Sequence, residues 1–444
     1  MTRLRLALTR TFRSLHVRNY RIYFVSQIVS FSGTWMQSVA LMWLVLSLTG
    51  SGVALGVTTG LQFGPSLLLA PWGGMLADRF DKRRLLMVTQ ATQGALALAL
   101  WALVAGDVVE LWMVYALSLA HGAVVAVDNP TRQAFASEMV SSEDLSNAVG
   151  LNGAIVMAAR TVGPAVGGIV IAAAGVATCF LVNAFSYVAV LTGLALMRAS
   201  ELRPAERQPR GRGQLRAALR YVRAVPELRL PLAMMAVVGT LAFNFRVLLP
   251  LMATDVFHGG AGTMSLLMAV NGAGTVVGAL AAASRRAPTR RTLLLSALSF
   301  GCFTIAAAYA PTLELALFFL VPTGISGLIF SSTCNATLQV NSSDEMRGRV
   351  MGLYAVVFFG STPFGAPLVG WIAETLDARA AIAFGGAATL VAALLAGRVR
   401  IRRELAATRR RLQAIRTGDD GVAPAQPDDP PAAPERTPAG ASRV

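Results

Sequence analysis

Charged residues are scarce in this chain of 444 residues: 14% are Asp, Glu, Lys or Arg, whereas 55% are hydrophobic. Soluble domains carry about 25% charged residues, so this deficit excludes an ordinary soluble fold. The mean hydropathy of +0.57 and the repeated long apolar runs instead predict an all-α protein that crosses a membrane many times.

Cysteine and lysine are also rare. The three cysteines, Cys179, Cys302 and Cys334, lie in apolar runs without a C-x-x-C pair, which excludes a disulfide framework and a cysteine metal site. Lys82 is the only lysine, so Arg supplies nearly all of the net charge of +16. Because these Arg residues fall in alternate loops, as insertion with positive charge inside requires, we interpret the charge as topological and exclude nucleic-acid binding.

Twelve apolar runs are each near or above the roughly 20 residues that a helix needs to cross a bilayer. We number the gaps between consecutive runs from the N-terminus. The odd-numbered gaps and their edges contain one Arg, Arg379, whereas the even-numbered gaps and their edges hold the basic clusters at 79–84, 198–229, 285–291 and 347–349. The even gaps and both termini are therefore predicted to be cytoplasmic. The predicted spans are 22–48, 53–76, 85–105, 111–137, 146–174, 178–197, 230–256, 263–283, 292–310, 313–340, 348–373 and 379–397.

A basic linker with nine Arg residues divides the spans into two sets of six. The basic N-terminal segment leads into a full-length span, so no cleaved signal peptide is expected. The tail after about residue 417 is rich in Pro, Ala, Gly and Asp, which predicts disorder. The predicted organisation is a cytoplasmic N-terminus at 1–21, a six-helix bundle at 22–197, a cytoplasmic linker at 198–229, a second six-helix bundle at 230–397 and a largely disordered cytoplasmic tail at 398–444.

The two sets of spans repeat each other in order. Asn129-x-Thr131-x-Gln133 in the fourth span has its counterpart in Asn335-x-Thr337-x-Gln339 in the tenth. Gly163-Pro164-x-x-Gly167-Gly168 in the fifth span likewise matches Gly365-Ala366-Pro367-x-x-Gly370 in the eleventh. Such a parallel repeat is expected when two helical bundles are related by an axis along the membrane normal.

The short turn between the second and third spans reads Gly74-x-Leu76-Ala77-Asp78-Arg79-x-x-Lys82-Arg83. Asp78 is expected to accept backbone N–H groups at the start of the next span. This motif resembles the loop 2–3 signature of the major facilitator superfamily, although Asp81 stands where that signature has Gly. The resemblance implies two six-helix bundles and a cytoplasmic gate, in which Asp78, Arg79 and the neighbouring cations tie the second span to the eleventh. The predicted gating residues are Gly74, Asp78, Arg79, Lys82 and Arg83.

Polar residues in the first span share one helical face. Gln27, Ser30, Thr34 and Gln37 follow at spacings of three, four and three, with Trp35 beside them. In lipid such groups face either protein or a water-filled cavity. Two interpretations stay open: a cavity-lining strip that binds substrate, or hydrogen bonding between helices.

Ionisable residues within spans are few, which makes each a candidate for coupling. Arg160 in the fifth span needs a partner, and Asp128 in the fourth is the best candidate, although Arg132 at i+4 competes for it. Asp128 either alternates between partners, takes a proton, or forms a permanent structural ion pair. His121 can titrate near neutral pH or serve as a structural hydrogen-bonding group.

A further set of polar residues in the spans forms the predicted substrate cavity. Arg246 is a second deep cation, and two cations with one clear carboxylate would suit an anionic or oxygen-rich substrate. These additional cavity candidates are Asn152, Asn183, Asn244, Arg246, Asn271, Asn335 and Gln339.

The fifth-span motif Gly163-Pro164-x-x-Gly167-Gly168 resembles the motif of antiporters in the same superfamily, with Ala159 where that motif begins with Gly. The arginine that precedes Q-G in the family's fourth span is Ser118 here, and His121-Gly122 replaces Q-G. Arg132 or Arg160 would then take its role. The blocks Asn19-Tyr20-Arg21, Gly33-Thr34-Trp35-Met36-Gln37, Asp128-Asn129-Pro130-Thr131-Arg132-Gln133 and Asn147–Asn152 are similar to the branch with the enterobactin exporter and macrolide-type efflux proteins.

These resemblances imply a monomeric secondary transporter of a bacterial inner membrane. It would export an amphipathic siderophore or drug by alternating access, with protons as the coupling ion. The alternatives are a lysophospholipid flippase, a nutrient importer, or a scaffold or sensor without transport. No H-E-x-x-H motif and no Ser/Lys or Asp pair occurs in adjacent spans, so we expect no enzyme activity, no metal and no cofactor.

Overall fold

The computed structural model describes residues 12–203, 214–285 and 287–417, and helices are the only regular elements there. The elements are η1 (Arg13–His16), α2 (Arg18–Thr49), α3 (Gly52–Arg79), α4 (Lys82–Ala105), α5 (Leu111–Met139), α6 (Ser142–Ala195), η2 (Ala199–Glu201), α7 (Gln214–Ala224), α8 (Pro226–Leu241), α9 (Phe245–Leu251), η3 (Met252–Val256), α10 (Ala261–Ala283), α11 (Arg290–Ala308), α12 (Leu313–Val340), α13 (Asp344–Gly360), α14 (Thr362–Thr375) and α15 (Ala378–Thr417).

Eleven stretches of the described residues are long and apolar enough to cross a membrane. One of them is α6, whose 54 residues contain both the fifth and the sixth predicted spans. Gly175 interrupts it with a φ of 80°, and beyond this point the Sγ of Cys179 lies 3.9 Å from the carbonyl oxygen of Gly167. The chain therefore folds back at Gly175, a backbone conformation that glycine adopts at little cost.

Three predicted spans have different bounds in the structure. The seventh is broken at residues 242–244 into α8 and α9, and the eleventh is broken at Ser361 into α13 and α14. The last helix does not end at 397 but continues to Thr417. Residues 1–11 of the predicted basic N-terminus, 204–213 of the linker and 418–444 of the tail lie outside the described residues.

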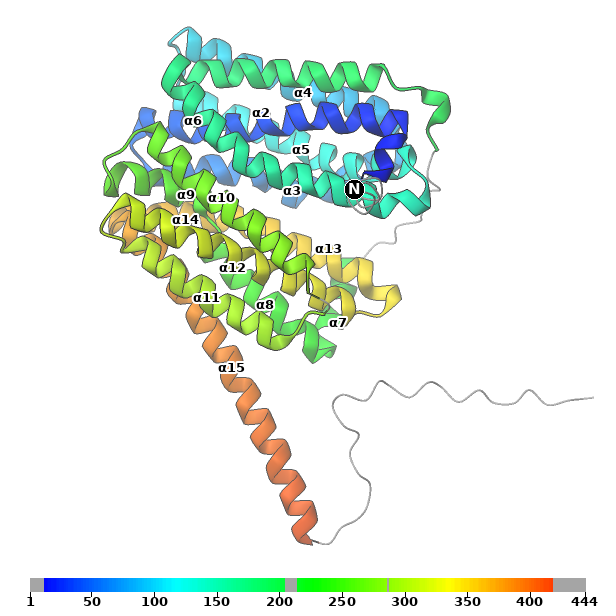
Figure 1. Ribbon diagram of the computed structural model, residues 1–444, viewed down its shortest axis with the longest axis vertical. Coiled ribbons are helices and arrows are strands. Elements are labelled where there is room, and N and C mark those ends of the chain that lie inside the picture. Colours follow the sequence, from blue (N-terminus) through cyan, green and yellow to red (C-terminus); the bar gives the residue numbers. More distant parts are fainter. Residues whose placement is uncertain (1–11, 204–213, 286, 418–444) are drawn as a thin grey trace, which may run out of the picture. The chain divides into compact units, whose positions relative to one another are not determined.

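The helices form two groups within residues 12–394. Helices α2 to α6 pack among themselves, as do α8 to α14 with the first part of α15. Figure 1 shows the first group in blue to teal and the second in green to orange. Two pairs bridge the groups most broadly, α3 with α14 and α6 with α10. Residues 395–417 continue α15 as a separate unit.

Equivalent packing in the two groups follows the sequence repeat. Gly163 of α6 lies against Trp35 of α2, and Gly168 lies against Ser265 of α10. In the second group Gly365 lies against Thr240 of α8, and Gly370 lies against Gly52 of α3. The matched glycines thus let each helix approach one neighbour in its own group and one in the other group, since a side chain at these positions would clash.

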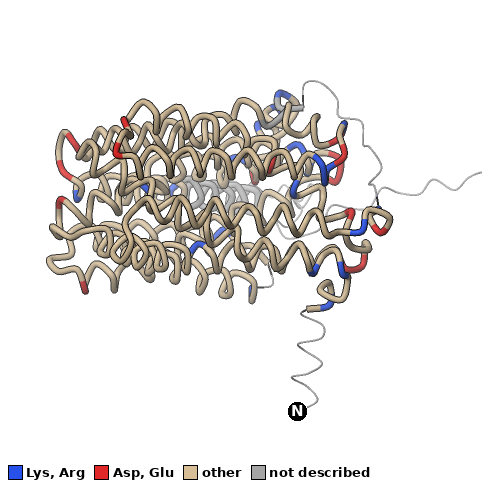
Figure 2. Tube along the Cα trace, turned by 90° about the horizontal axis from the view of Figure 1, so that it is seen from above, with Lys and Arg blue, Asp and Glu red and all other residues tan. Residues whose placement is uncertain are grey.

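Basic residues gather at one end of the helices, shown at the right of Figure 2. This end carries the 79–84 turn and the linker helix α7, and we call it the cytoplasmic end. There the backbone N–H of Ser343 donates to the hydroxyl of Tyr221 at 3.1 Å, so α7 is fastened to the start of α13. Hydrogen bonding with Ser343 lowers the pKa of Tyr221 below its ordinary value.

The two groups touch closely at the external end. A Cβ on Gly52 would lie 2.9 Å from the carbonyl oxygen of Gly370, and one on Gly60 would lie 3.2 Å from that of Pro363. The Oε1 of Glu374 on α14 accepts hydrogen bonds from Ser51 Oγ and, at 3.0 Å, from Val53 N. A carboxylate at the N-terminus of α3 is favoured by the helix dipole, so this contact holds the external end together.

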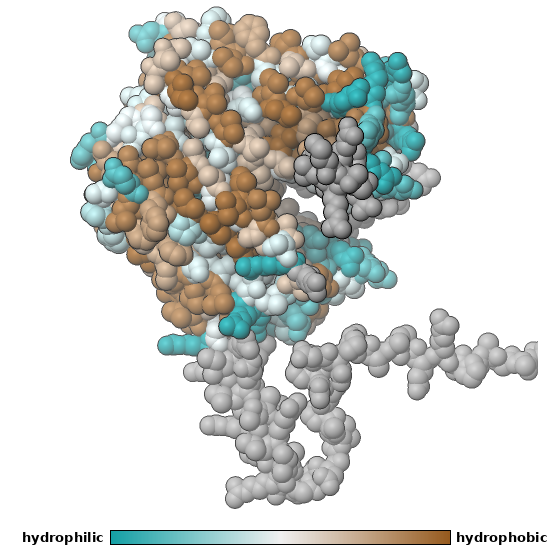
Figure 3. Space-filling view, viewed as in Figure 1, coloured by the Kyte–Doolittle hydropathy of each residue, from teal (hydrophilic) through white to brown (hydrophobic). Residues whose placement is uncertain are grey.

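The close approach of α3 and α14 does not continue to the cytoplasmic end. Trp72 and Met75 of α3 are more than half exposed, and no atom lies within 4 Å of a Cβ placed on Gly352 of α13. In Figure 3 hydrophobic side chains cover the flanks of both groups, and the surface is notched between them near the hydrophilic cytoplasmic end. The two groups of helices are thus in contact at the external end and separated at the cytoplasmic end.

Candidate functional site

Asp128 of α5 lies at the centre of a buried polar cluster and is 3% exposed. Its Oδ1 accepts hydrogen bonds from Thr89 Oγ1 at 2.7 Å and from Gln90 Nε2 at 2.8 Å, both on α4. Its Oδ2 accepts from Nη2 of Arg132 at 2.7 Å and from Nε of Arg132 at 3.2 Å. Four donors thus meet one carboxylate, which is what a buried charge requires in order to remain ionised.

Arg132 extends this cluster to α2. Its Nη1 donates to the Oε1 of Gln27, and its guanidinium lies 5.1 Å from the ring centroid of Phe31. Asp128 therefore pairs with Arg132, the competitor on its own helix, and not with Arg160. The i, i+4 spacing places the two side chains on one face, so this pair needs no movement between helices.

A second cluster contains two cations around one indole ring. The guanidinium of Arg160 on α6 lies 5.7 Å from the ring centroid of Trp35, and that of Arg246 on α9 lies 5.2 Å from it. Arg246 also lies 5.6 Å from the ring of Phe63 and donates to Ser38 Oγ. Among the described residues, no carboxylate lies within ion-pair distance of either arginine.

Several buried polar atoms of this second cluster and its surroundings have no hydrogen-bond partner. They include Nε of Arg246, Oδ1 of Asn244 and Nδ2 of Asn271. Asn244 precedes α9, directly after the break in the seventh span, and its Nδ2 donates to the Thr240 carbonyl at 2.7 Å. Unpaired buried polar groups cost free energy, so a cluster that keeps them is suited to a polar ligand that would pair them.

The second cluster lies where the two groups of helices meet. Trp35, Phe63 and Arg160 come from the first group, whereas Arg246 comes from the second. A Cβ on Gly272 of α10 would lie 3.1 Å from the backbone oxygen of Arg160, so these helices also touch here. A ligand bound to both arginines would therefore contact both groups at once.

His121 on α5 makes no side-chain hydrogen bond to any described residue. The next residue, Gly122, approaches the backbone of Leu61 and Gln62 on α3, directly before Phe63. His121 is influenced electrostatically by both Arg246 and Asp128, which places it near both clusters. Its imidazole is consequently the titratable group that adjoins both.

The polar face of α2 divides between the clusters and helix contacts. Gln27 accepts a hydrogen bond from Arg132, and the Oε1 of Gln37 accepts one from Asn183 Nδ2 at 2.6 Å. Ser30 is buried, and Thr34 lies near the hydroxyl of Tyr187. These contacts support hydrogen bonding between helices for Gln27 and Gln37, while Trp35 faces the two arginines.

Three predicted cavity residues lie away from the arginines. Gln339 Nε2 donates to Asn335 Oδ1 at 2.6 Å near the cytoplasmic end of α12. Asn152 lies in the cytoplasmic part of α6, partly exposed, and makes no side-chain hydrogen bond to a described residue. From the predicted cavity set, Trp35 contacts both guanidinium groups. Asn244 stands two residues before Arg246, and Asn271 precedes Gly272, which lies against the backbone of Arg160.

In this structure Lys82 and Arg83 of the gating motif bind residues of the first group. Nζ of Lys82 lies 2.6 Å from Oε1 of Glu138 on α5, and Nε of Arg83 donates to the Leu194 carbonyl at 2.7 Å. Asp81, not Asp78, caps α4, because its Oδ1 accepts from the backbone N–H of Arg84 at 2.7 Å. Gly74 and Asp78 lie in the last two turns of α3, and Arg79 ends that helix.

Some residues of the site were absent from the sequence-based set. Thr89 and Gln90 have a detectable signal, because a polar pair within an apolar span is unusual. Glu374 also has one, as an acidic residue at the external end of a span. Ser38 and Phe63 have none, since a serine and a phenylalanine are ordinary in such helices.

Comparison with known proteins reveals a family match over nearly the whole chain. A model for a family of the major facilitator superfamily, described as transmembrane secretion effector, matches residues 9–416. The staphyloferrin A transporter of Staphylococcus aureus is 24% identical over 83% of this chain and 93% of its own length. The enterobactin exporter of Salmonella paratyphi A is 25% identical over 85% of this chain and 91% of its own.

Solved structures share the fold at lower identity. The nucleoside transporter NupG has a TM-score of 0.68 with 14% identity, over 85% of this chain and 98% of its own. A bacterial homologue of the lysosomal transporter Spinster, in an inward-facing and unoccupied conformation, has a TM-score of 0.64 with 14% identity, over 85% and 94%.

Proposed function

The chain belongs to the transmembrane secretion effector family of the major facilitator superfamily, and from this premise we propose that it exports an anionic, oxygen-rich siderophore by proton antiport. It is a multi-pass membrane transporter and belongs to no enzyme family. Relatives named for staphyloferrin A and enterobactin support the choice of substrate class.

One observation carries the proposal: two guanidinium groups that have no carboxylate partner in the described part of the chain flank the same indole ring. A partly buried arginine without a counter-ion is costly, and an anionic substrate would reduce that cost on binding. Guanidinium groups bind carboxylate and similar planar oxygen anions through paired N–H donors. Trp35 and Phe63 supply flat apolar walls that suit an amphipathic or aromatic part of the same molecule.

Transport would proceed by alternating access. Substrate would enter from the cytoplasmic end, where the two helix groups are separated in this structure. It would bind between the groups at Arg160 and Arg246. Release would require the external contact of Glu374 with the start of α3 to open. In that outward-open form we propose that Asp78 and Arg79 tie α3 to the second group, while Lys82 and Arg83 remain bound within the first.

Protons are proposed to couple through His121 or Asp128. The four donors around Asp128 favour a permanently ionised carboxylate, which makes it the weaker carrier of the two. His121 lies within electrostatic reach of Arg246, so its protonation would change the local charge where substrate binds.

A lysophospholipid flippase is the second candidate, because of one apolar pocket. It has a volume of about 400 Å³ between α2 and α6 and is lined by residues that include Val29, Met36, Val166 and Phe185. Such a pocket could take an acyl chain directly from the bilayer. Uptake of fluorescent lysophospholipid into proteoliposomes, with no transport of siderophores, would favour this candidate.

The test of the proposal is uptake into everted membrane vesicles. Vesicles with the protein should accumulate iron-free enterobactin or staphyloferrin A when their interior is acidic, and a protonophore should abolish this uptake. A lipophilic cation such as ethidium serves as the opposite-charge control. Accumulation of ethidium without either siderophore would contradict the proposal, as would siderophore uptake that is insensitive to the protonophore.

A further inference from the structure

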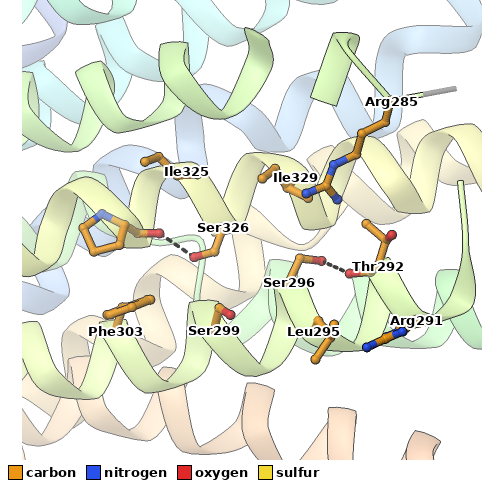
Figure 4. A pocket seen from close by; sticks show the side chains of 11 residues that line it. Arg285, Arg291, Thr292, Leu295, Ser296, Ser299, Phe303, Ile325, Ser326 and Ile329 are labelled. Atoms are coloured by element: carbon orange, nitrogen blue, oxygen red, sulfur yellow. Dashed lines mark hydrogen bonds between the residues drawn. The ribbon is translucent and has the colours of Figure 1, made fainter. Parts of the chain in front are cut away.

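A pocket of about 460 Å³ lies between α11 and α12, near the end of α10. It is separate from the site described above, because α11 packs broadly against α12 and the first part of α15 and not against the first group. Figure 4 shows Arg285 and Arg291 at one end of this pocket and Phe303 at the other. The pocket is therefore cationic at one end, and apolar side chains and hydroxyl groups line the rest of it.

The cationic end faces the cytoplasmic side. Arg285 follows α10 and Arg291 is in the first turn of α11, so both belong to a loop that carries positive charge inside. Neither side chain forms an ion pair or hydrogen bond with a described residue. Their guanidinium groups therefore stand without counter-ions at the level of the inner-leaflet headgroups.

The rest of the pocket descends along the helices into the hydrocarbon region. Leu295 and Phe303 line it from α11, and Ile325 and Ile329 line it from α12. The hydroxyls of Ser296 and Ser326 in the same stretch donate to backbone carbonyls of their own helices. Leu295 is 51% exposed, so the pocket is open towards lipid at this point. A small soluble anion could occupy only the mouth, whereas an amphiphile would fill both ends.

We propose that this pocket binds one anionic phospholipid of the cytoplasmic leaflet. Its phosphate lies between Arg285 and Arg291, and one acyl chain follows the apolar surface between α11 and α12. Basic pockets between spans on the cytoplasmic side are suited to such headgroups, and each arginine contributes about fivefold to binding. The lipid fastens α11 to α12 and is not the transported molecule, so this proposal does not depend on the proposed substrate.

Native mass spectrometry of the full chain in a neutral detergent tests this inference. Phosphatidylglycerol should be retained as one adduct and phosphatidylcholine should not. The variant with Arg285→Gln and Arg291→Gln should bind phosphatidylglycerol about 25-fold more weakly. The variant with Arg285→Lys and Arg291→Lys, which keeps the charge, should retain most of the binding.

Controls separate this site from general charge attraction. The variant with Arg347→Gln and Arg349→Gln loses the same charge at the cytoplasmic start of α13 and should bind phosphatidylglycerol normally. Excess inorganic phosphate should not displace the lipid. Equal binding by the parent and the Arg285/Arg291 glutamine variant would overturn the proposal, and so would displacement by inorganic phosphate, which would indicate a soluble-anion site.

Discussion

Two buried charge clusters in this protein differ in whether their charges are matched. Around Asp128, a carboxylate and the guanidinium of Arg132 satisfy each other with help from Thr89 and Gln90. Around Trp35, two guanidinium groups face the meeting point of the two helix groups without an anion. In the first cluster the two charges are matched within one group and hold helices together, whereas in the second the proposed anionic ligand would supply the missing charge.

The two clusters should also differ in how they affect the free energy of unfolding. A paired buried charge is strongly destabilising to break, because the remaining partner is left unpaired. An unpaired buried charge already carries that cost in the empty protein. Removing charge should consequently have opposite effects on folding in the two places, and this contrast can be measured.

The largest effect is expected for Asp128→Asn. Loss of the carboxylate leaves Arg132 without its counter-ion, so we expect a loss of roughly 3–5 kcal/mol in the free energy of unfolding. A lower midpoint of thermal unfolding in detergent would register it. The double variant with Arg132→Gln should recover a large part of the loss. Unchanged stability together with lost proton coupling would instead make Asp128 a proton carrier.

The next effect concerns the unmatched cluster, through Arg246→Gln. A hydrogen bond to a charged group contributes about 1.5–3 kcal/mol, so substrate binding should weaken about 10- to 100-fold. Thermal stability should be unchanged or higher, because an uncompensated charge is removed. The measurement pairs siderophore uptake with thermal unfolding, and Arg21→Gln on the exposed cytoplasmic surface serves as the control. A large fall in stability would mean that Arg246 is structurally paired.

A smaller effect is expected at the external contact, from Glu374→Gln. The neutral amide keeps the size but loses the charge-assisted bonds to Ser51 and Val53, so closure should weaken by about 1 kcal/mol. Spin labels on the exposed Leu48 and Leu376, substituted by cysteine in a background without native cysteines, should report more of the separated form. An unaltered distance distribution would exclude a gating role for Glu374.

The smallest effects on stability and substrate affinity are expected when one hydroxyl group is removed from each cluster. Thr89→Val removes a donor to Asp128 and should lower the free energy of unfolding by about 1 kcal/mol without a change in substrate affinity. Ser38→Ala removes the hydroxyl that orients Arg246 and should raise the KM for substrate severalfold with little change in stability. If the two variants behaved alike, the contrast between a structural and a binding cluster would fail.

Several features could be predicted from the sequence because they depend on local chemistry. A chain in lipid must satisfy its backbone within helices, so apolar runs give the spans directly. The sequence showed that Arg132 competes with Arg160 for Asp128, since residues four apart share a helix face. The glycine repeat predicted equivalent packing in the two groups, which the structure has at Gly168 and Gly370.

Other features depend on contacts that no local pattern encodes. The breaks at residues 242–244 and at Ser361 fall within predicted spans, beside Asn244 and Pro363, and the extension of α15 to Thr417 follows a change to polar residues. Asp81 caps α4 because it directly precedes Lys82, the first residue of that helix, whereas Asp78 still belongs to α3.

The sequence by itself determined that this protein crosses the membrane as helices, because runs of about 20 apolar residues satisfy their backbone hydrogen bonds in lipid by forming helices. Only the tertiary structure decided that Arg160 and Arg246 share Trp35. These residues come from three helices in two groups, and their meeting depends on how the groups close against each other at the external end. That closure brings two like charges together at a cost which an anionic ligand can offset.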